Sequence, residues 1–463
     1  MTLKKGEIVE LRVEQAAFGG KGLAKVDGMA VFVELAVPGD RVRARIVRKK
    51  KNYAEARVLE LIEPSPDRVD APCLYSGNCG GCKWQFLAYE KQLEFKQHQV
   101  QECLEHIGSI TDVPIHATLP SELRYGYRNK MEFSCSTRRW LLPDEMGSAE
   151  TVSGSALGLH VPGTFDKVLD IDHCGLQPEL GNQILANVRR FIQASPLPVY
   201  GLRSHEGFWR FLVLRHSVLN DQWMVNIITA WEDRSHLQAL ADFLIRTYPP
   251  VVSVVNNITA RKASIAVGEY EILLAGQAFI VDRIGSFEFE ISANSFFQTN
   301  TRQARKLYEQ VLRFAQLTGT ETVLDLFCGA GTIAIYISDR ARTVTGLEIV
   351  ESALADAERN CRRNGVHNCR FIGGDLRRTL PQIDVRPEVV IIDPPRAGMH
   401  QDVVKQVLIL APERIVYVSC NPATLARDLA LLGEDYTVNE VQPVDMFPHT
   451  FHIEAVARLT RKR

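Results

Sequence analysis

Apolar and polar residues alternate or cluster in short runs through the first part of the chain, and this pattern predicts β-strands. The runs EIVELRVEQ, GMAVFVE, DRVRARIVRK and YAEARVLELI are separated by glycine-rich turns such as FGGKGLAKVDG. Four or five short strands in so short a segment predict a small barrel of the oligonucleotide-binding type. We place this barrel in residues 1–63.

The pattern changes after the barrel. The segment PSPDRVDAP (64–72) is typical of a linker, and the run LAYEKQLEFKQHQVQECLEHI (87–107) predicts a helix. Short strands then mix with helices near 180–195 and 233–247. We expect a central mixed α+β domain over residues 64–285, whose strand order the pattern does not specify.

The last third of the chain is more regular. From about residue 300, helices alternate with buried strands, which predicts a doubly wound parallel sheet. The predicted fold class is therefore α/β, with a Rossmann-like domain over residues 286–463 that follows the barrel and the central domain.

The composition indicates the number of domains, the general class of protein and the cellular compartment. A chain of 463 residues is too long for one core, so two to four domains are expected. Hydrophobic residues make up 46% and charged residues 24%, as in ordinary globular proteins. The start MTLKKGEIVELRVEQ lacks the apolar segment of a signal peptide, and no apolar run approaches membrane-spanning length. We therefore expect a cytoplasmic monomer without a membrane partner.

The formal net charge of −1 does not indicate a nucleic-acid partner, but its distribution does. Between Arg41 and Arg57 there are eight basic residues and one acid, Glu55. A local basic patch can bind phosphates in a neutral chain, so this stretch of the barrel predicts contact with RNA. The alternative interpretation is a solvated strand-and-turn face.

A glycine turn after the first strand of the α/β domain indicates a cofactor site. The run TVLDLFCGAGTIAIYIS (322–338) predicts a strand, a turn with Gly329 and Gly331, and a helix. The next strand ends in Glu348, placed to accept both hydroxyls of a ribose, and the third, CRFIGGDL (369–376), ends in Asp375, placed to receive an adenine amino group. A G-x-G turn without the third glycine of dinucleotide enzymes favours S-adenosylmethionine (SAM) over NAD.

The following two strands end in further reactive groups. The run VVIIDPPRAGMH (389–400) ends its strand in Asp393, and YVSCNPATLARDL (417–429) ends its strand in Cys420. With Asp325, Glu348 and Asp375, these groups are expected at one edge of the sheet. A thiol there has two interpretations, a small buried packing residue or a nucleophile.

Ten cysteines in a reducing compartment argue for metal or catalytic use rather than disulfides. The spacing Cys73-x5-Cys79-x2-Cys82 is that of metal ligands on a glycine-rich loop. A fourth ligand has to come from elsewhere, and the candidates are Cys103, Cys135 and Cys174. The spacing does not separate a [4Fe–4S] cluster from a zinc site with four cysteines.

Five motifs now carry a specific resemblance: SANSFFQTN, VLDLFCGAGT, IIDPPRAG, YVSCNPATLARDL and DMFPHTFHIEAV. In sequence and order they resemble those of the RNA (uracil-5-)methyltransferases, most of all the members that act on 23S rRNA. The barrel resembles a TRAM domain, and the cysteine spacing resembles the family's iron–sulfur site. The resemblance covers nearly the whole chain and is weakest over 183–285. It implies a SAM-dependent methyltransferase domain, a [4Fe–4S] cluster, and 23S rRNA as the partner.

The resemblance also implies roles for single residues. Cys420 corresponds to the family's nucleophile, and Glu454 in HIEAV corresponds to the base that removes the C5 proton. The fourth cluster ligand corresponds to Cys174. The cofactor contacts correspond to Gln298, Phe327, Glu348, Asp375 and Asp393, and also to Thr332, where the family often has asparagine. Phe451 stands where relatives often have glycine.

These residue types suit the chemistry of uracil C5, which is a poor nucleophile. A thiolate that adds to C6 makes C5 electron-rich, and a base then removes the C5 proton so that the thiolate leaves. We expect a lowered pKa for Cys420, because the helix ATLARDL begins just after it. The reacting base has to be flipped out or taken from a loop.

Three alternatives remain beside methylation of 23S rRNA. The same reaction on tRNA uses the same catalytic residues. Methylation of an exocyclic amine needs no thiol, and Arg396 stands where amine methyltransferases often have an aromatic residue. A non-catalytic RNA-binding protein would need neither SAM nor the Glu348 and Asp393 carboxylates.

Overall fold

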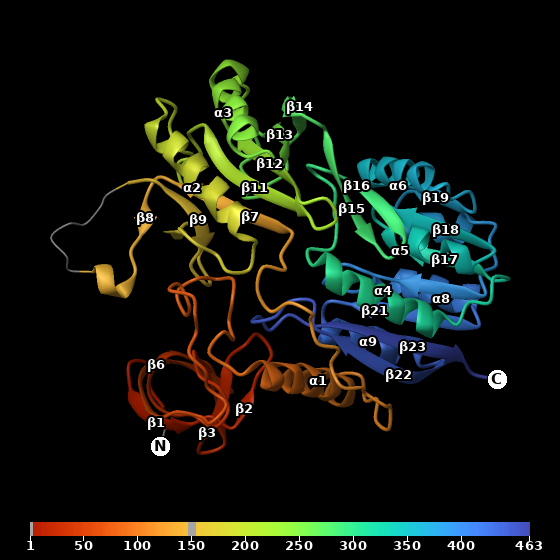
Figure 1. Cartoon of the computed structure of the whole chain (residues 1–463). Coiled ribbons are helices and arrows are strands. Elements are labelled where there is room, and N and C mark those ends of the chain that lie inside the picture. The colour runs from red at the N-terminus through yellow and green to blue at the C-terminus, as the bar shows by residue number, and fades with distance from the viewer. Residues whose placement is uncertain (1–2, 147–153) are drawn as a thin grey trace.

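The structure is a computed structural model that describes residues 3–146 and 154–463. Its first unit is a six-stranded sheet that curls into a barrel (Figure 1). The order in the sheet is β1-β5-β6-β4-β3-β2, with β1 (Ile8–Arg12), β2 (Gln15–Ala16), β3 (Gly22–Val26), β4 (Met29–Glu34), β5 (Arg41–Lys49) and β6 (Tyr53–Glu63). Val31, Val42 and Ile46 are fully buried inside it, because alternate residues of a strand face the same side. The predicted barrel is confirmed.

The barrel is seated against the segments that follow it. The indole Nε1 of Trp84 donates a hydrogen bond to the Gly20 carbonyl at 3.3 Å. Phe18, on the same barrel turn, meets Phe451 edge-to-face with ring centroids 6.1 Å apart. The barrel therefore contacts the C-terminal part of the chain directly.

The central unit is an eight-stranded sheet with the order β14-β13-β12-β11-β7-β9-β10-β8. Its strands are β7 (Lys130–Ser136), β8 (Arg139–Trp140), β9 (Ala156–His160), β10 (Val168–Asp170), β11 (Trp209–Ser217), β12 (Gln222–Thr229), β13 (Val251–Ile258) and β14 (Tyr270–Gly276). A short 3₁₀ turn, η1 (Pro143–Glu145), follows β8. The helices α2 (Glu179–Ala194) and α3 (Arg234–Thr247) share one apolar core with this sheet and confirm the two helices predicted here.

The C-terminal unit is a seven-stranded sheet with the order β19-β18-β17-β20-β21-β23-β22. Its strands are β17 (Thr322–Leu326), β18 (Thr343–Glu348), β19 (Cys369–Gly373), β20 (Val389–Ile392), β21 (Arg414–Ser419), β22 (Tyr436–Val444) and β23 (Glu454–Arg461). The pairs from β19 to β21 are parallel, whereas β23 is antiparallel to both β21 and β22. The doubly wound prediction is confirmed.

Helices cover both faces of this sheet. One apolar core includes residues of α4 (Thr301–Ala315), α5 (Thr332–Tyr336) and α6 (Glu351–Asn364). The other includes residues of α1 (Tyr89–His106), α7 (Leu376–Thr379), α8 (Gln401–Leu410) and α9 (Pro422–Leu432). Short 3₁₀ turns follow α5 and α7, namely η2 (Ser338–Arg340) and η3 (Leu380–Gln382).

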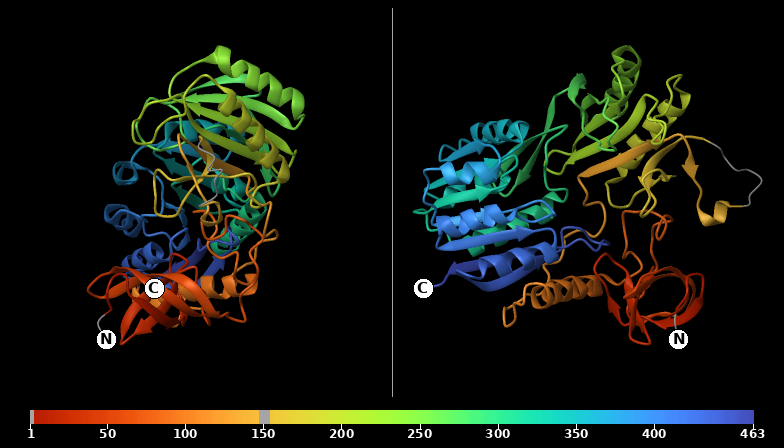
Figure 2. Two further views of the ribbon diagram at one scale, coloured as in Figure 1. Left: turned by 90° about the vertical axis from the view of Figure 1, so that its left-hand side faces the viewer. Right: turned by 180° about the vertical axis from the view of Figure 1, so that it is seen from behind.

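The helix α1 confirms the prediction for 87–107, but it packs on the C-terminal sheet rather than on the central one. Figure 2 shows it running from the barrel along that sheet. Residues just beyond it extend the contact, since Ile115 and Leu119 form bridges with Val441 and Val444 of β22. The hairpin β15 (Phe279–Ile284) and β16 (Phe287–Ser292) also packs into the C-terminal core. The division at residues 63 and 285 stays a prediction.

No helix among residues 3–146 and 154–463 is long and apolar enough to cross a membrane.

Candidate active site

The predicted reactive groups do lie along one edge of the C-terminal sheet. Glu348 is the last residue of β18, Asp393 follows β20, and Cys420 follows β21. Asp325 lies one residue before the end of β17. Because β17, β18, β20 and β21 run parallel, their carboxyl ends meet at the same edge.

The glycine turn at this edge forms a small cavity of ≈ 30 Å³. Phe327 and Gly331 have positive φ angles of 64° and 73°, so the chain turns sharply between β17 and α5. A Cβ on Gly331 would stand 2.8 Å from the Phe371 ring, which explains the glycine. The cavity wall includes four of the six predicted cofactor contacts: Gln298, Phe327, Thr332 and Asp393.

Asp325, a buried carboxylate, lines the same cavity. Its side chain is fully buried, and neither oxygen has a hydrogen-bond partner among the residues that the structure describes. Burial, with the nearby Asp393, raises its pKa well above the usual range. A buried acid without a partner favours a ligand that brings a positive charge or a donor. SAM, which carries a sulfonium and an ammonium group, fits this requirement.

Glu348 and Asp375 lie outside the cavity. Glu348 Oε2 accepts a hydrogen bond from the Gly329 amide at 3.1 Å, and Oε1 accepts from the Ile349 and Val350 amides, both at 2.8 Å. A carboxylate has about four acceptor positions, so Glu348 keeps capacity for a ligand.

Asp375 is more strongly engaged by the protein. It caps α7 and forms an ion pair with Arg377, whose guanidinium lowers the pKa of Asp375 to about 2. The structure therefore shows a structural partner for this carboxylate, and its contact with adenine stays a prediction.

Gln298 lies just before α4, close to the position of a helix cap. The structure assigns that cap to Asn300, whose side chain accepts from the Gln303 amide. Gln298 instead lines the cavity, and Thr332 beside it bonds the Tyr308 hydroxyl at 2.8 Å. Tyr308, which lies on α4, also lines the cavity. The sequence did not predict this, because Tyr308 belongs to no recognisable motif.

Cys420 and Glu454 are brought together by strand register. Ser419 pairs with Ala455 across the antiparallel β21 and β23, so the next residue of one strand faces the preceding residue of the other. Asn421 Nδ2 donates to the Arg396 carbonyl at 3.0 Å, which fixes the Asp393–Arg396 loop beside the thiol. Glu454 is 6% exposed. The Cys420 thiol, the buried Glu454 carboxylate and the Asp393 loop thus lie at the same edge of the sheet.

The pKa of the thiol differs in direction from our expectation. Burial, with Glu454 and Asp393, raises the pKa of Cys420 to about 11, and only Arg396 among its charged neighbours acts to lower it. Burial and Asp393 likewise raise the pKa of Glu454 well above its usual range. The expected lowering by α9 was wrong, because two acids and burial outweigh one helix terminus. A positive ligand beside Asp393 acts in the opposite direction on both groups.

Side chains of α1 hold the loop before Glu454 in place. Lys96 Nζ donates to Asp445 Oδ1 at 2.6 Å and to the Phe447 carbonyl at 3.1 Å, and the Lys96 and Asp445 side chains are both 0% exposed. Tyr89 donates its hydroxyl to the other Asp445 oxygen at 2.7 Å. Sequence reasoning missed these contacts, since neither Lys96 nor Asp445 stands in a motif that marks a buried pair.

The segment just after Cys82 also holds the loop before Glu454 in place. The amides of Lys83 and Trp84 donate to the His449 carbonyl at 2.8 and 3.0 Å. The His449 ring stacks on Tyr125 with centroids 4.4 Å apart, and its amide donates to Gln92 Oε1 at 2.8 Å. These contacts give His449 a structural role in holding the loop.

The four cysteines predicted as metal ligands line one cavity of ≈ 340 Å³: Cys73, Cys79, Cys82 and Cys174. Of the other candidates, Cys103 lies on α1 and Cys135 in the core of β7. Burial and neighbouring thiols raise the pKa of Cys79 to about 11 and of Cys82 to about 12. Over residues 3–146 and 154–463, no three His, Cys, Asp or Glu side chains form a group that would hold a metal ion.

The basic stretch of the barrel is partly neutralised. Arg41 pairs with Glu63 at 2.7 Å and with Glu10 at 3.4 Å, and Arg43 pairs with Glu60 at 2.5 Å. These pairs lie between neighbouring strands of the barrel. Contact with RNA through this face stays a prediction.

The sheet order, the glycine turn and the acids at the sheet edge define the fold of a SAM-dependent methyltransferase with an N-terminal TRAM domain. Two sequence profiles match accordingly, a methyltransferase domain over residues 323–408 and a TRAM domain over residues 3–59. A third, described as tRNA (uracil-5-)-methyltransferase, matches residues 378–462.

Comparisons along the whole chain narrow the class. A protein of Chlorobaculum tepidum described as an uncharacterized RNA methyltransferase is 44% identical over 99% of this chain and 97% of its own. One of Halalkalibacterium halodurans with the same description is 40% identical over 99% and 98%. The crystal structure of Pyrococcus abyssi tRNA (uracil-54, C5)-methyltransferase with S-adenosyl-L-homocysteine is 30% identical, covers 98% of this chain and 100% of that one, and has a TM-score of 0.76. The chain belongs to the RNA (uracil-5-)methyltransferase family.

Proposed function

We propose that the protein methylates C5 of a uridine in RNA with SAM, through a covalent adduct between Cys420 and C6. The observation that carries this proposal is the register of β21 and β23, which sets Cys420 beside Glu454 at the end of the sheet. Asp393 follows β20, the neighbour of β21 in the sheet, and acts to raise the pKa of both groups.

Each group has a distinct task. Cys420 Sγ adds to C6 of the flipped uracil and makes C5 electron-rich. Bound SAM supplies the electrophilic methyl group. Glu454 then takes the proton from C5, and the Cys420 thiolate is released. Asp393 and Asp325 favour a positively charged ligand at this edge, and such a charge lowers the pKa values of Cys420 and Glu454 toward their working range.

We propose Gln298, Phe327, Thr332, Glu348, Asp375 and Asp393 as the residues that bind SAM. The cavity supports Gln298, Phe327, Thr332 and Asp393 most directly, because they line it together with the unpartnered Asp325. Glu348 supports the ribose contact through its place at the end of β18.

The proposed substrate is 23S rRNA, on the resemblance of the barrel and the cysteine loop to the members that act on it. A tRNA uridine is the second candidate, because the solved relative from Pyrococcus abyssi is a tRNA enzyme. Methylation of an exocyclic amine is disfavoured by the Cys420 and Glu454 pair, since that reaction needs no thiol.

We further propose that Cys73, Cys79, Cys82 and Cys174 hold a [4Fe–4S] cluster. Their common cavity and their mutual electrostatic influence support this assignment. In a cluster each cysteine binds a different iron, whereas four zinc ligands surround one ion, so a cluster needs its sulfurs farther apart. The role is structural, because the Cys82 loop holds the His449 carbonyl and no step of the reaction transfers an electron to the protein.

The test uses RNA transcripts that contain 5-fluorouridine, which has no C5 proton for Glu454 to remove. With SAM, the wild-type protein should form a covalent complex that survives a denaturing gel, and Cys420→Ala should form none. Separate incubation with ribosomal and transfer RNA, followed by mapping of the trapped nucleotide, chooses between the two substrates. Turnover that persists in Cys420→Ala would contradict the thiol mechanism.

A further inference from the structure

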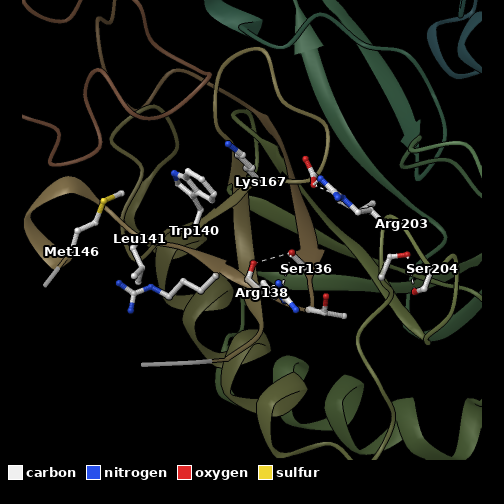
Figure 3. Close-up of a pocket in the computed structure, with 13 residues that line it drawn as sticks. Ser136, Arg138, Trp140, Leu141, Met146, Lys167, Arg203 and Ser204 are labelled. Atoms are coloured by element: carbon white, nitrogen blue, oxygen red, sulfur yellow. Dashed lines mark hydrogen bonds and ion pairs between the residues drawn. The ribbon is translucent and has the colours of Figure 1, made fainter. Parts of the chain in front are cut away.

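Two large cavities lie side by side on the central unit, away from the sheet edge that carries Cys420. One, of ≈ 800 Å³, lies between the barrel, the cysteine loop and the turn from β9 to β10. The other, of ≈ 790 Å³, lies between the segment that joins β7 to β8 and the loop around Arg203 (Figure 3). Their walls share Trp140, Leu141, Met146 and Lys167, so the two cavities meet at the β8 strand.

Basic side chains outnumber acidic ones on the walls, although Lys21, Arg139 and Arg203 form ion pairs with neighbouring acids. Seven basic side chains line the two cavities, against two acidic ones, Glu34 and Asp166. The seven are Lys21, Arg57, Lys83, Arg138, Arg139, Lys167 and Arg203. Arg57 and Arg138 are exposed and make no ion pair with any residue that the structure describes. Such a surface favours a ligand with several negative charges.

Trp140 stands where the cavities meet. It is 37% exposed, and Lys167 Nζ lies 3.9 Å from the centroid of its ring. Figure 3 shows the ring and the lysine together on one wall, with Arg203 and Ser204 across from them. An exposed indole among cations is the usual platform for an unpaired base, which stacks on the ring while the cations contact its phosphates.

One end of the first cavity lies close to the segment that precedes Glu454. Gly20 and Lys83 line it, and a Cβ on Gly20 would stand 3.1 Å from Lys83 Cβ and 3.4 Å from Phe451 Cβ. Phe451 lies three residues before Glu454. The two cavities together therefore form a basic surface that extends from the Gly20 turn, which contacts Phe451, to Trp140.

We propose that this surface, here called the Trp140 groove, binds a single-stranded segment of the RNA substrate that flanks the reacting uridine. One unpaired base of the segment stacks on Trp140, and Lys167, Arg138 and Arg57 contact phosphates. That the bound RNA is a substrate rests on the proposed function. That the groove binds single-stranded RNA does not.

The test measures RNA binding separately from methyl transfer. The probe is a fluorescein-labelled single-stranded oligouridylate of about 12 nucleotides, a length within the range such grooves hold. Its dissociation constant is measured by anisotropy with the full chain carrying Cys420→Ala, so that no adduct forms. Trp140→Ala should weaken binding about tenfold, in line with the stacking of one base, and Trp140→Phe should keep most of the affinity.

Two further variants sharpen the result. Trp231→Ala removes a tryptophan that is 43% exposed but lines neither cavity, and it should leave the dissociation constant unchanged. Arg138→Ala should weaken binding and lower the slope of affinity against salt by about one unit, as expected for one lost phosphate contact. Equal affinity of wild type, Trp140→Ala and Arg138→Ala would overturn the proposal, as would an equal loss in Trp231→Ala. Because no methyl transfer is measured, failure of the proposed reaction leaves this result standing.

Discussion

The buried pair of Lys96 and Asp445 allows a sharp test of how the loop before Glu454 is held in place. Both side chains are 0% exposed, and their charged atoms are 2.6 Å apart. The change Lys96→Met keeps an apolar stem of similar length. Among the residues that the structure describes, it leaves the Asp445 carboxylate with only the Tyr89 hydroxyl and the Phe447 amide as donors. Removal of one partner from a buried ion pair costs about 3–5 kcal/mol of stability.

We therefore expect Lys96→Met to lower the free energy of unfolding by about 3–5 kcal/mol and to reduce kcat, because Asp445 begins the loop that leads to Glu454. The double variant Lys96→Met with Asp445→Asn removes both charges and should recover more than half of the lost stability. The measurement is urea unfolding followed by near-UV circular dichroism, with methyl transfer measured in parallel.

The matched control is Lys91→Met on the same helix. Lys91 pairs with Glu94 at the surface at 2.7 Å, and a solvated pair of this kind adds little to stability. The reasoning is refuted if Lys96→Met unfolds at the same urea concentration as Lys91→Met, or if the double variant is no more stable than Lys96→Met alone.

Three other outcomes follow from the site. Glu454→Gln should leave the C5 proton in place, so a covalent complex with ordinary uridine RNA should accumulate on denaturing gels; rapid turnover without it would argue against Glu454 as the base. Because the pKa of Cys420 is about 11, its alkylation by iodoacetamide in the ligand-free protein should rise about tenfold per pH unit between pH 7 and 9, followed by mass spectrometry of its peptide; a plateau near pH 8 would contradict this. If the proposed [4Fe–4S] cluster is present, Cys79→Ala should abolish its visible absorption and weaken folding or RNA binding; normal folding and turnover without the absorption would refute the proposed structural role.

The buried acid Asp393 adds a dependence of stability on pH. Burial raises its folded-state pKa to about 7, above the value of about 3.9 for an unfolded aspartate. The folded state therefore binds more protons, and the contribution of this group is fully present below about pH 4 and lost as the pH rises through about 7. Thermal unfolding of the ligand-free protein should show a fall in stability from pH 5 to 8 that is smaller in Asp393→Asn. An equal fall in both would exclude Asp393 as its source.

Local sequence was sufficient for the sheet edge. The ends of β18, β20 and β21 follow from short apolar runs that stop at Glu348, Asp393 and Cys420, and parallel strands necessarily bring such ends together. The cysteine spacing likewise predicted three thiols of one loop. Cys174 came only from the family resemblance, because nothing local links it to that loop.

Contacts between distant segments could not be predicted in this way. Cys420 meets Glu454 only because β23 inserts antiparallel between β21 and β22, which no local pattern specifies. Lys96 and Asp445 are 349 positions apart, and a lysine on a polar helix normally predicts exposure. The pKa of Cys420 was misjudged for the same reason, since the groups that raise it come from other strands.

The contacts between the barrel and the loop before Glu454 bear on how a target nucleotide would be selected. Trp84 and Phe451 tie the barrel turn at Gly20 and Phe18 to the loop that leads to Glu454. If the barrel binds RNA as the sequence predicts, Cys420 would reach only a nucleotide at a set span from the bound segment. On our proposal, a uridine would then be selected by its distance along the folded RNA as well as by its neighbours.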